Sequence, residues 1–219
     1  MTEYQYPDSA RPELIEFLPK NYKTVLEIGC GRGGFKKSLD QNTELWGVEP
    51  NESAAKQAEF KGYKVLVGLY EEVAHKCPDD YFDLIVCNDV IEHMVDHEKF
   101  LTEIKGKMKS TGCLVGSIPN IRYYPVLFDL LFKKDWQYTE IGVLDKTHLR
   151  FFTEKSLIRT FESTDYTIQL LKGINATEKY WFTLRSTAKY LFINFPFGLF
   201  KDTRYMQFGF RVTKSLNGR

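Results

Sequence analysis

The chain has 219 residues, enough for one large domain with a substantial hydrophobic core. Hydrophobic residues make up 43% of it and charged residues 27%, a balance that is typical of globular proteins and excludes an intrinsically disordered chain. The formal net charge of +1 and the lack of a basic run argue against a nucleic-acid partner. No apolar stretch approaches the ~20 residues that a membrane-spanning helix requires.

The N-terminal sequence lacks the charged segment and the apolar segment that together mark a secretory signal. The four cysteines, at positions 30, 77, 87 and 113, show no CxxC spacing, and two of them fall in apolar segments that resemble strands. This pattern fits buried free thiols better than disulfide bonds. We therefore expect a cytoplasmic protein.

Five short apolar segments in the first half of the chain are bounded by polar residues and glycine, as buried strands are. These predicted strands cover residues 24–28, 45–48, 63–67, 82–87 and 113–118. Helices are predicted around them over residues 11–18, 33–39, 51–61 and 96–108, with Asn51 as an N-cap. The alternation predicts right-handed βαβ units and a parallel sheet, in which ligands bind at the carboxyl ends of the strands.

The alternation breaks after residue 119. Helices are predicted over 123–132 and 153–161, and strands over 166–171 and 205–212. An aromatic-rich insertion at 179–200, predicted to be helical to about residue 193, separates these two strands. We predict one domain, residues 1–219, which consists of an N-terminal cap (1–22), a cofactor-binding half (22–120) and two acceptor-side insertions (121–165 and 174–204).

A glycine-rich loop follows the first predicted strand. Gly29, Gly31 and Gly34 match the GxGxxG pattern of dinucleotide sites, with Cys30 inside the loop. Gly29 and Gly31 permit a tight turn and close approach of a ligand, and Gly34 permits close packing of the next helix. Glu27 precedes the loop and would repel a pyrophosphate, whereas it would attract the ammonium of S-adenosylmethionine (SAM). The loop therefore favours SAM over NAD.

Two further positions favour a nucleoside ligand. Glu49 and Pro50 close the second predicted strand, where an acid can hold two ribose hydroxyls. The loop after the third strand contains Leu69 and Tyr70, either of which would cover a face of the adenine. Because SAM and NAD both need the ribose contact, Glu49 indicates a nucleoside ligand but does not indicate which reaction takes place.

Three motifs together resemble the class I SAM-dependent methyltransferases: VLEIGCGRG at 25–33, GVEPN at 47–51 and FDLIVCNDVIEH at 82–93. The resemblance is close over about residues 22–120. It implies an α/β fold of the Rossmann-like, doubly wound type, with a seven-stranded, mostly parallel sheet whose last strand is antiparallel. It also implies that SAM rests over the glycine loop, Glu49 and the loop at 68–70, and against Asn88, Asp89 and Val90.

His148 is the candidate catalytic residue. It lies in DKTHLRFFT at 145–153, which resembles a segment of ubiquinone-type and glycan-pathway O-methyltransferases. A neutral imidazole there would act as general base toward an acceptor hydroxyl, with Asp145 orienting the ring. The alternative is a histidine that only caps a loop by hydrogen bonds.

Two other charged groups allow more than one interpretation. Arg11 would reach the methionine carboxylate if the N-terminal segment folded over the cofactor, but the segment would equally pack as a terminal helix. Asp89, Glu92 and His93 resemble an acid–Glu–His metal site of some ubiquinone-type relatives. Since many metal-free relatives have a histidine there, we predict no metal.

Aromatic residues crowd the acceptor side and suit several partners. They would stack on sugar rings, or they would pack in a core or a homodimer. With nearby lysines they would instead touch a lipid-linked substrate at a membrane surface. The residues are Tyr123, Tyr124, Phe128, Lys133, Lys134, Trp136, Tyr138, Trp181, Phe182, Lys189 and Lys201.

The sequence thus predicts a SAM-dependent O-methyltransferase that acts on a small molecule, with a sugar as first choice. Two alternatives stay open: a non-catalytic module that binds SAM and regulates a partner, and an NAD-dependent oxidoreductase. A nucleic-acid methyltransferase is disfavoured, because Asn120 is not part of an Asn-Pro-Pro-aromatic motif.

Overall fold

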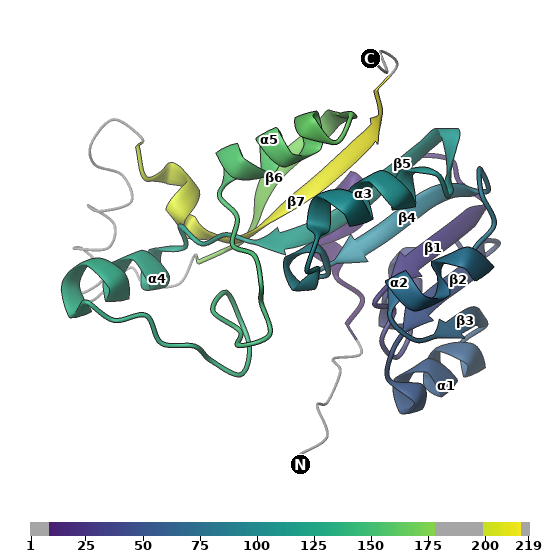
Figure 1. Ribbon diagram of the computed structural model, residues 1–219, viewed down its shortest axis with the longest axis horizontal. Coiled ribbons are helices and arrows are strands. Elements are labelled where there is room, and N and C mark those ends of the chain that lie inside the picture. Colours follow the sequence, from purple (N-terminus) through teal and green to yellow (C-terminus); the bar gives the residue numbers. More distant parts are fainter. Residues whose placement is uncertain (1–8, 178–198, 216–219) are drawn as a thin grey trace.

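Seven strands form a single sheet in the computed structural model, which describes residues 9–177 and 199–215 (Figure 1). The strand order is β3-β2-β1-β4-β5-β7-β6, in which β7 runs antiparallel to both of its neighbours, β5 and β6, and the other pairs are parallel. The strands are β1 (Thr24–Ile28), β2 (Glu44–Glu49), β3 (Tyr63–Val67), β4 (Phe82–Asn88), β5 (Met108–Pro119), β6 (Tyr166–Ala176) and β7 (Tyr205–Lys214). The predicted Rossmann-like fold with an antiparallel last strand is confirmed.

The helices are short and lie between the strands (Figure 1). The α-helices are α1 (Glu52–Phe60), α2 (Tyr70–Val73), α3 (His97–Lys105), α4 (Tyr124–Phe128) and α5 (Glu154–Ser163). The 3-10 helices are Pro12–Phe17, Gly34–Ser38, Ala74–Lys76, Ile91–His93 and Lys201–Arg204. Among the described residues, no helix is both long and apolar enough to cross a bilayer.

Three predicted helices differ from the observed ones. The segments 11–18 and 33–39 form 3-10 helices of six and five residues, because Arg11 and Gly33 enter them with left-handed backbone conformations and each helix ends after one or two turns. The helix predicted over 96–108 ends at Gly106, so that Met108 belongs to β5. The helix predicted to reach about residue 193 lies outside the described residues.

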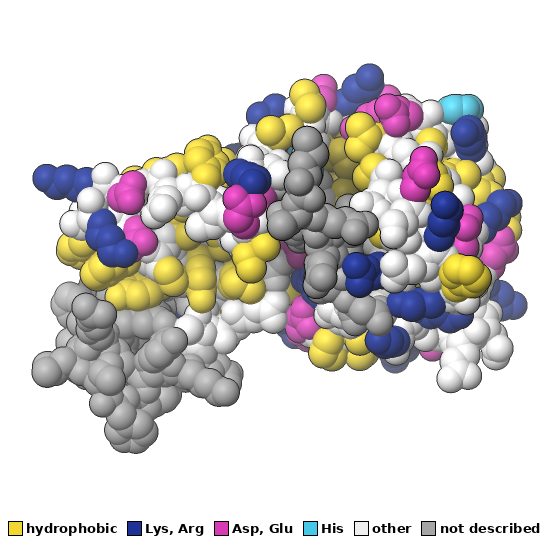
Figure 2. Space-filling view, turned by 90° about the horizontal axis from the view of Figure 1, so that it is seen from below, with side chains coloured by type: hydrophobic (Ala, Val, Ile, Leu, Met, Phe, Trp, Pro, Cys, Tyr) yellow, Lys and Arg dark blue, Asp and Glu magenta, His cyan; other side chains and the backbone are white. Residues whose placement is uncertain are grey.

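Residues 121–152 project from the sheet after β5, and we call them the arm (Figure 1). The arm begins with α4, which continues as a π-helical turn (Asp129–Lys133), and neither part contains a buried residue. Phe132 is 62% exposed and Leu131 57%. Figure 2 shows hydrophobic side chains gathered along the arm.

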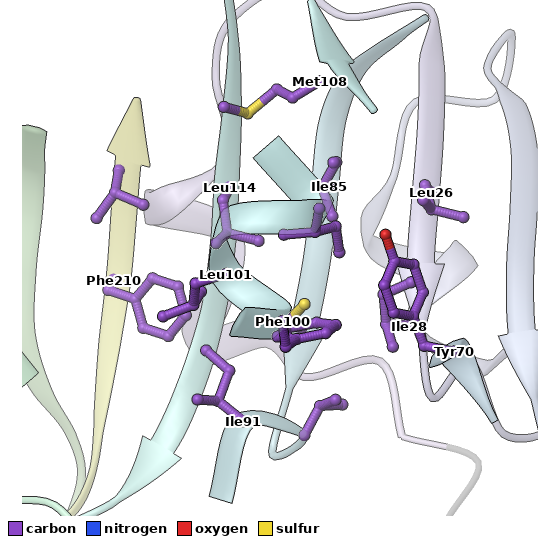
Figure 3. Close-up of a cluster of buried hydrophobic side chains, with 14 of the residues drawn as sticks. Leu26, Ile28, Tyr70, Ile85, Ile91, Phe100, Leu101, Met108, Leu114 and Phe210 are labelled. Carbon is purple, nitrogen blue, oxygen red and sulfur yellow. The ribbon is translucent and has the colours of Figure 1, made fainter. Parts of the chain in front are cut away.

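The sheet buries side chains on both faces, as the continuous apolar strands predict. One face packs against α2, α3 and α5, where Phe100 and Leu101 of α3 meet Ile85 and Leu114 of the sheet (Figure 3). The other face packs against α1 and the 3-10 helices Pro12–Phe17 and Gly34–Ser38. This packing on both faces holds the carboxyl ends of β1, β2, β4 and β5 in fixed positions.

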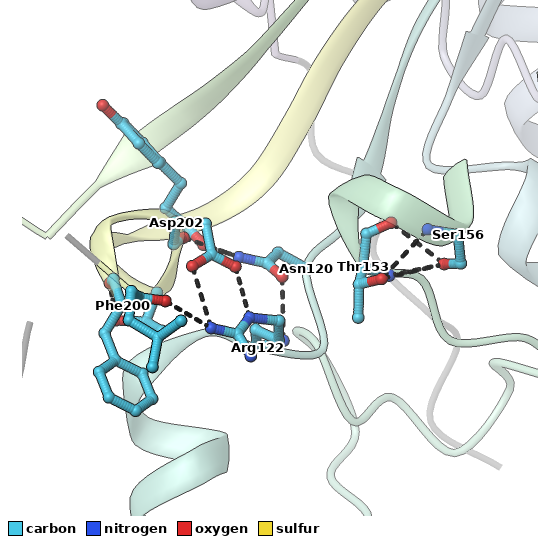
Figure 4. Close-up of polar contacts among 9 residues, drawn as sticks. Asn120, Arg122, Thr153, Ser156, Phe200 and Asp202 are labelled. Carbon is cyan, nitrogen blue, oxygen red and sulfur yellow. Dashed lines mark hydrogen bonds and ion pairs between the residues drawn. The ribbon is translucent and has the colours of Figure 1, made fainter. Parts of the chain in front are cut away.

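Polar side chains fix the chain where it leaves the sheet (Figure 4). Arg122 Nε donates to Asp202 Oδ2 at 2.6 Å, and Arg122 Nη2 donates to the Leu199 carbonyl at 3.0 Å. Asn120 Nδ2 donates to the carbonyls of Asp202 and Tyr205 at 2.9 and 3.0 Å. These contacts tie the start of the arm to the segment that leads into β7.

Side-chain caps begin α1 and α5, and the first of them is the predicted Asn51. Asn51 Oδ1 accepts from the Ala54 amide at 2.9 Å and begins α1. Thr153 Oγ1 accepts from the Ser156 amide at 3.2 Å and begins α5 (Figure 4). Each cap satisfies an amide that has no partner within its helix.

Candidate active site

The loop after β1 contains three residues with positive φ: Gly29 (67°), Gly31 (52°) and Gly33 (68°). Gly29 and Gly31 thus make the turn for which the sequence needs glycine. A Cβ at Gly33 would lie 3.0 Å from the Tyr63 ring and 3.2 Å from Ala58. Gly33, which the sequence does not single out, therefore packs closely against Tyr63 and Ala58.

Hydrogen bonds hold this loop against β2. The amides of Gly29 and Cys30 donate to the Val48 carbonyl at 2.8 and 3.2 Å. The Gly31 amide donates to Glu49 Oε2 at 2.8 Å. The loop backbone is therefore fixed at the carboxyl end of the sheet, where the sequence predicts the cofactor.

Glu27 lies under the loop and is only 4% exposed. The Tyr63 hydroxyl donates to its Oε2 at 2.7 Å. Burial raises the pKa of Glu27 to about 8, the hydrogen bond from Tyr63 opposes this rise, and the charge of Glu49 adds to it. A buried carboxyl of this kind is stabilised in its charged form by a cation, which the ammonium of SAM would supply.

Glu49 ends β2 with its side chain buried. Its Oε1 accepts from the Asn51 amide at 2.9 Å, and its Oε2 accepts from Gly31. Pro50 makes the turn between β2 and the N-cap of α1. Backbone amides thus orient the carboxylate, and each oxygen keeps a second lone pair that a ribose hydroxyl can use.

Leu69 and Tyr70 follow β3 and point in different directions. Leu69 is 54% exposed, with its amide donating to Glu72 Oε2 at 3.0 Å. Tyr70 is 2% exposed, and its ring packs edge-on against Phe100 at 5.1 Å between centroids. The expectation that Tyr70 covers the adenine is therefore corrected, because its ring belongs to the core. Leu69 keeps that role as a candidate.

The end of β4 presents three candidate residues. Asn88 Oδ1 is buried and has no hydrogen-bond partner among the described residues. Asp89 has a left-handed backbone with φ 54°, which turns the chain sharply after the strand. A Val90 methyl carbon lies 3.1 Å from where a Cβ would stand on Gly29, so this valine packs directly under the glycine loop.

Arg11 reaches the same place from the N-terminal segment. Its Nη1 lies 2.7 Å from Asp89 Oδ2, and its Nε lies 2.6 Å from Glu13. Its Nη2 donates to Ser117 Oγ at 3.0 Å. Gln207 and Ser117 both donate to Asp89 Oδ1. No sequence motif marks Ser117 and Gln207, which come from β5 and β7.

His148 is buried in the arm near the end of β4. Its Nδ1 lies 3.1 Å from the Val143 carbonyl, which can only accept, so Nδ1 carries a proton when this bond forms. Its Nε2 lies 3.9 Å from Glu92 Oε1. The Asp145 carboxylate accepts from the amide and hydroxyl of Thr147 instead. The prediction that Asp145 orients the ring is thus corrected: the Val143 carbonyl orients it.

His148 also belongs to a group of three candidate metal ligands. One ligand atom each from Glu92, His93 and His148 lies within 4.8 Å of the others. Both Glu92 oxygens are buried without a hydrogen-bond partner among the described residues, and burial raises the pKa of Glu92 well above its usual range. These groups could hold a divalent cation. Asp89, the acid expected in such a site, pairs with Arg11 instead.

Aromatic rings extend from His148 along the arm. The Phe151 ring lies 6.5 Å from His148 and 5.3 Å from Trp136, edge-on in both pairs. Tyr138 continues the row at 6.5 Å from Trp136. Trp181, Phe182 and Lys189, also expected on the acceptor side, lie outside the described residues.

Comparison with known proteins is consistent with this geometry. Residues 2–171 match a family model described as a methyltransferase domain. A ubiquinone biosynthesis O-methyltransferase of Bradyrhizobium diazoefficiens is 32% identical over 100 residues, which are 44% of this chain and 40% of that enzyme. One of Actinobacillus pleuropneumoniae is 24% identical over 184 residues, 77% of each protein.

Solved structures show the same fold. A SAM-dependent methyltransferase from Archaeoglobus fulgidus superposes with a TM-score of 0.65 at 20% identity, covering 92% of this chain and 90% of that one. A possible histamine N-methyltransferase from Thermotoga maritima superposes with a TM-score of 0.62 at 21% identity, covering 93% and 86%. Both are described as SAM-dependent methyltransferases, and only the second description names an acceptor.

Proposed function

The chain belongs to the class I SAM-dependent methyltransferase family, and from this premise we propose that it methylates a hydroxyl group of a small molecule or sugar. The cofactor is SAM, which supplies a methyl group on a sulfonium and leaves as a neutral thioether. Membership of this family excludes the alternative function, that of an NAD-dependent oxidoreductase. The acceptor and the methylated atom are the parts of this proposal that go beyond the family.

The residues around the glycine loop fit SAM. Glu27 is a buried acid in need of a cation and would accept from the ammonium. Glu49 is oriented by two backbone amides and would hold the ribose hydroxyls. Arg11 stands at the end of β4 and would bind the methionine carboxylate, while Leu69 would cover the adenine.

The orientation of His148 carries the proposal of O-methylation. With its Nδ1 proton directed to Val143, the neutral ring has its lone pair on Nε2. That nitrogen would accept the proton of the acceptor hydroxyl as the new O–CH₃ bond forms and the S–CH₃ bond breaks. General-base catalysis of this kind contributes roughly 10²–10⁴ in rate, and holding the partners in line with water excluded contributes the rest.

Two observations favour a hydroxylated ring as acceptor. Phe151 and Trp136 lie next to His148, and aromatic faces stack on sugar rings and on flat molecules. The relatives from Bradyrhizobium diazoefficiens and Actinobacillus pleuropneumoniae are named as O-methyltransferases. A sugar is our first choice for the acceptor.

The test is methyl transfer from isotopically labelled SAM to a small-molecule extract of the source cells, followed by chemical identification of the labelled product. We expect an O-methyl product, and we expect His148→Ala to slow transfer by roughly 10²–10⁴ while SAM affinity stays unchanged. His75→Ala changes an exposed histidine outside the site and serves as the matched control.

Each other outcome has a defined meaning. Full activity of His148→Ala would show that His148 is not the general base, so that catalysis would rest on positioning of the substrates alone. A labelled nitrogen would overturn O-methylation. SAM binding without transfer to any molecule would favour the alternative of a non-catalytic regulatory module.

A further inference from the structure

Tyr63 contacts Glu27 across an intervening strand. Glu27 lies on β1 and Tyr63 begins β3, with β2 between them. Two strand spacings separate β1 from β3 by roughly 9.5 Å. The Tyr63 hydroxyl nevertheless donates to Glu27 Oε2 at 2.7 Å, and both side chains are 4% exposed.

Glycines open the path for this contact. Gly47 of β2 is the register partner of both Glu27 and Val65, and Tyr63 lies two residues before Val65 on the same face of β3. A Cβ on Gly47 would stand 3.3 Å from the Tyr63 ring and 2.5 Å from Cys30 Sγ. A side chain at this position would therefore occupy the space through which the tyrosine crosses the sheet.

The same ring supports the glycine loop. A Cβ on Gly33 would stand 3.0 Å from the Tyr63 ring, so the loop rests directly on it. One tyrosine thus contacts both the acid under the loop and the loop itself. Nothing in the sequence of β3 marks this residue except its position at the start of the strand.

Among the described residues, none of the groups that face Glu27 is a cation. They are the Tyr63 hydroxyl, the Glu49 carboxylate on β2, and the thiols of Cys30 and Cys87. The carboxylate and the two thiols offer it no positive charge. Tyr63 is the group that the structure shows donating a hydrogen bond to this carboxylate.

We propose that Tyr63 is a positioning residue of the cofactor site, which holds one oxygen of Glu27 and thereby orients the carboxylate toward the ammonium of bound SAM. This inference rests on the proposed role of Glu27. It assigns to Tyr63 no contact with the methyl group or with the acceptor.

The test is calorimetric titration of Tyr63→Phe with SAM between pH 6.5 and 8.5. The phenylalanine keeps the ring against the glycines and removes only the hydroxyl. We expect SAM affinity to fall about tenfold at pH 7, the typical effect of a lost hydrogen bond to a charged group. Since the lost bond favoured the charged carboxylate, the rise of SAM affinity with pH should also move to higher pH.

A second ligand separates positioning from folding. 5′-Methylthioadenosine has the nucleoside and the sulfur of SAM but neither the ammonium nor the carboxylate. We expect its affinity to be the same for Tyr63→Phe and the wild type. Tyr81→Phe is the matched control, because the Tyr81 hydroxyl donates to Glu44 at 2.8 Å outside the site.

The two proposals fail in different ways. If the wild-type chain does not bind SAM, the proposed function fails. Suppose instead that the wild type binds SAM. If Tyr63→Phe then lowers the affinities for SAM and for 5′-methylthioadenosine equally, or changes neither, the role of Tyr63 is overturned. A double mutant with Glu27→Gln gives a further check, because Tyr63→Phe should then change SAM affinity by less than about twofold.

Discussion

Three carboxylates surround the glycine loop, and each has a different partner. Glu27 accepts from a tyrosine, Glu49 accepts from two backbone amides, and Asp89 pairs with Arg11. Arg11 is the only cation that the described residues pair with these acids. A ligand with an ammonium and a sulfonium complements this arrangement, whereas a pyrophosphate would meet repulsion.

Glu27 should leave a signature in the pH dependence of stability. Its pKa in the folded chain is about 8, above the usual 4.5, so the folded state holds a proton that the unfolded state releases between these values. This contribution is fully present below about pH 4.5, and it is lost as the pH rises through about 8.

Glu27→Gln cannot titrate and should therefore gain stability relative to the wild type as the pH rises. We expect the difference in free energy of unfolding to move in favour of the variant by a few kcal/mol (on the order of 2–4) between pH 5 and pH 8, measured by urea denaturation without SAM. Parallel curves for the two proteins would contradict the raised pKa.

At the scale of elements, the sheet order brings together residues that are far apart in the sequence. Strands β1, β4 and β5 are neighbours, so that the glycine loop, Asp89 and Ser117 meet at one edge. The arm then places His148 beside Glu92, whose carbonyl accepts from the Leu149 amide at 2.8 Å. The arm is therefore the element that brings His148 to the carboxyl end of β4.

The base of the arm depends on Arg122. Its guanidinium contacts both oxygens of Asp202, at 2.6 and 3.2 Å, and the pair is mostly shielded from water. We expect Arg122→Ala to lower the free energy of unfolding by about 1–2 kcal/mol and to increase proteolysis within residues 121–152.

Lys146→Ala is the matched control for Arg122→Ala. It removes an ion pair with Glu140 that is largely exposed within the same arm, and pairs of this kind contribute little. Equal effects of the two substitutions on proteolysis would show that Arg122 does not hold the base of the arm.

At the scale of the whole molecule, the sequence predicts the sheet better than the contacts between its parts. Apolar segments that end in glycine or an acidic residue indicate the parallel strands. The arrangement of the sheet is implied by the family that the motifs resemble. The local sequence does not mark Tyr63 and Gly33, because their contacts depend on a ring that crosses β2. The predictions for Tyr70 and Asp145 are wrong because proximity in sequence does not tell which way a side chain points.

Long-range polar contacts were also beyond prediction. In the described part of the chain, α4, the π-helical turn, α5 and β6 separate Arg122 from Asp202, and nothing in their local sequence pairs them. Ser117 and Gln207 reach Asp89 only because β5 and β7 are neighbours in the sheet. Such contacts require the three-dimensional fold.

Calorimetric titration with SAM and with NAD tests most directly whether the glycine loop and its acids bind SAM. We predict one SAM site and no NAD binding. Gly31→Asp should abolish SAM binding, because it strains a residue with φ 52° and adds a third carboxylate beside Glu27 and Glu49. Tight binding of NAD with no heat from SAM would contradict the account.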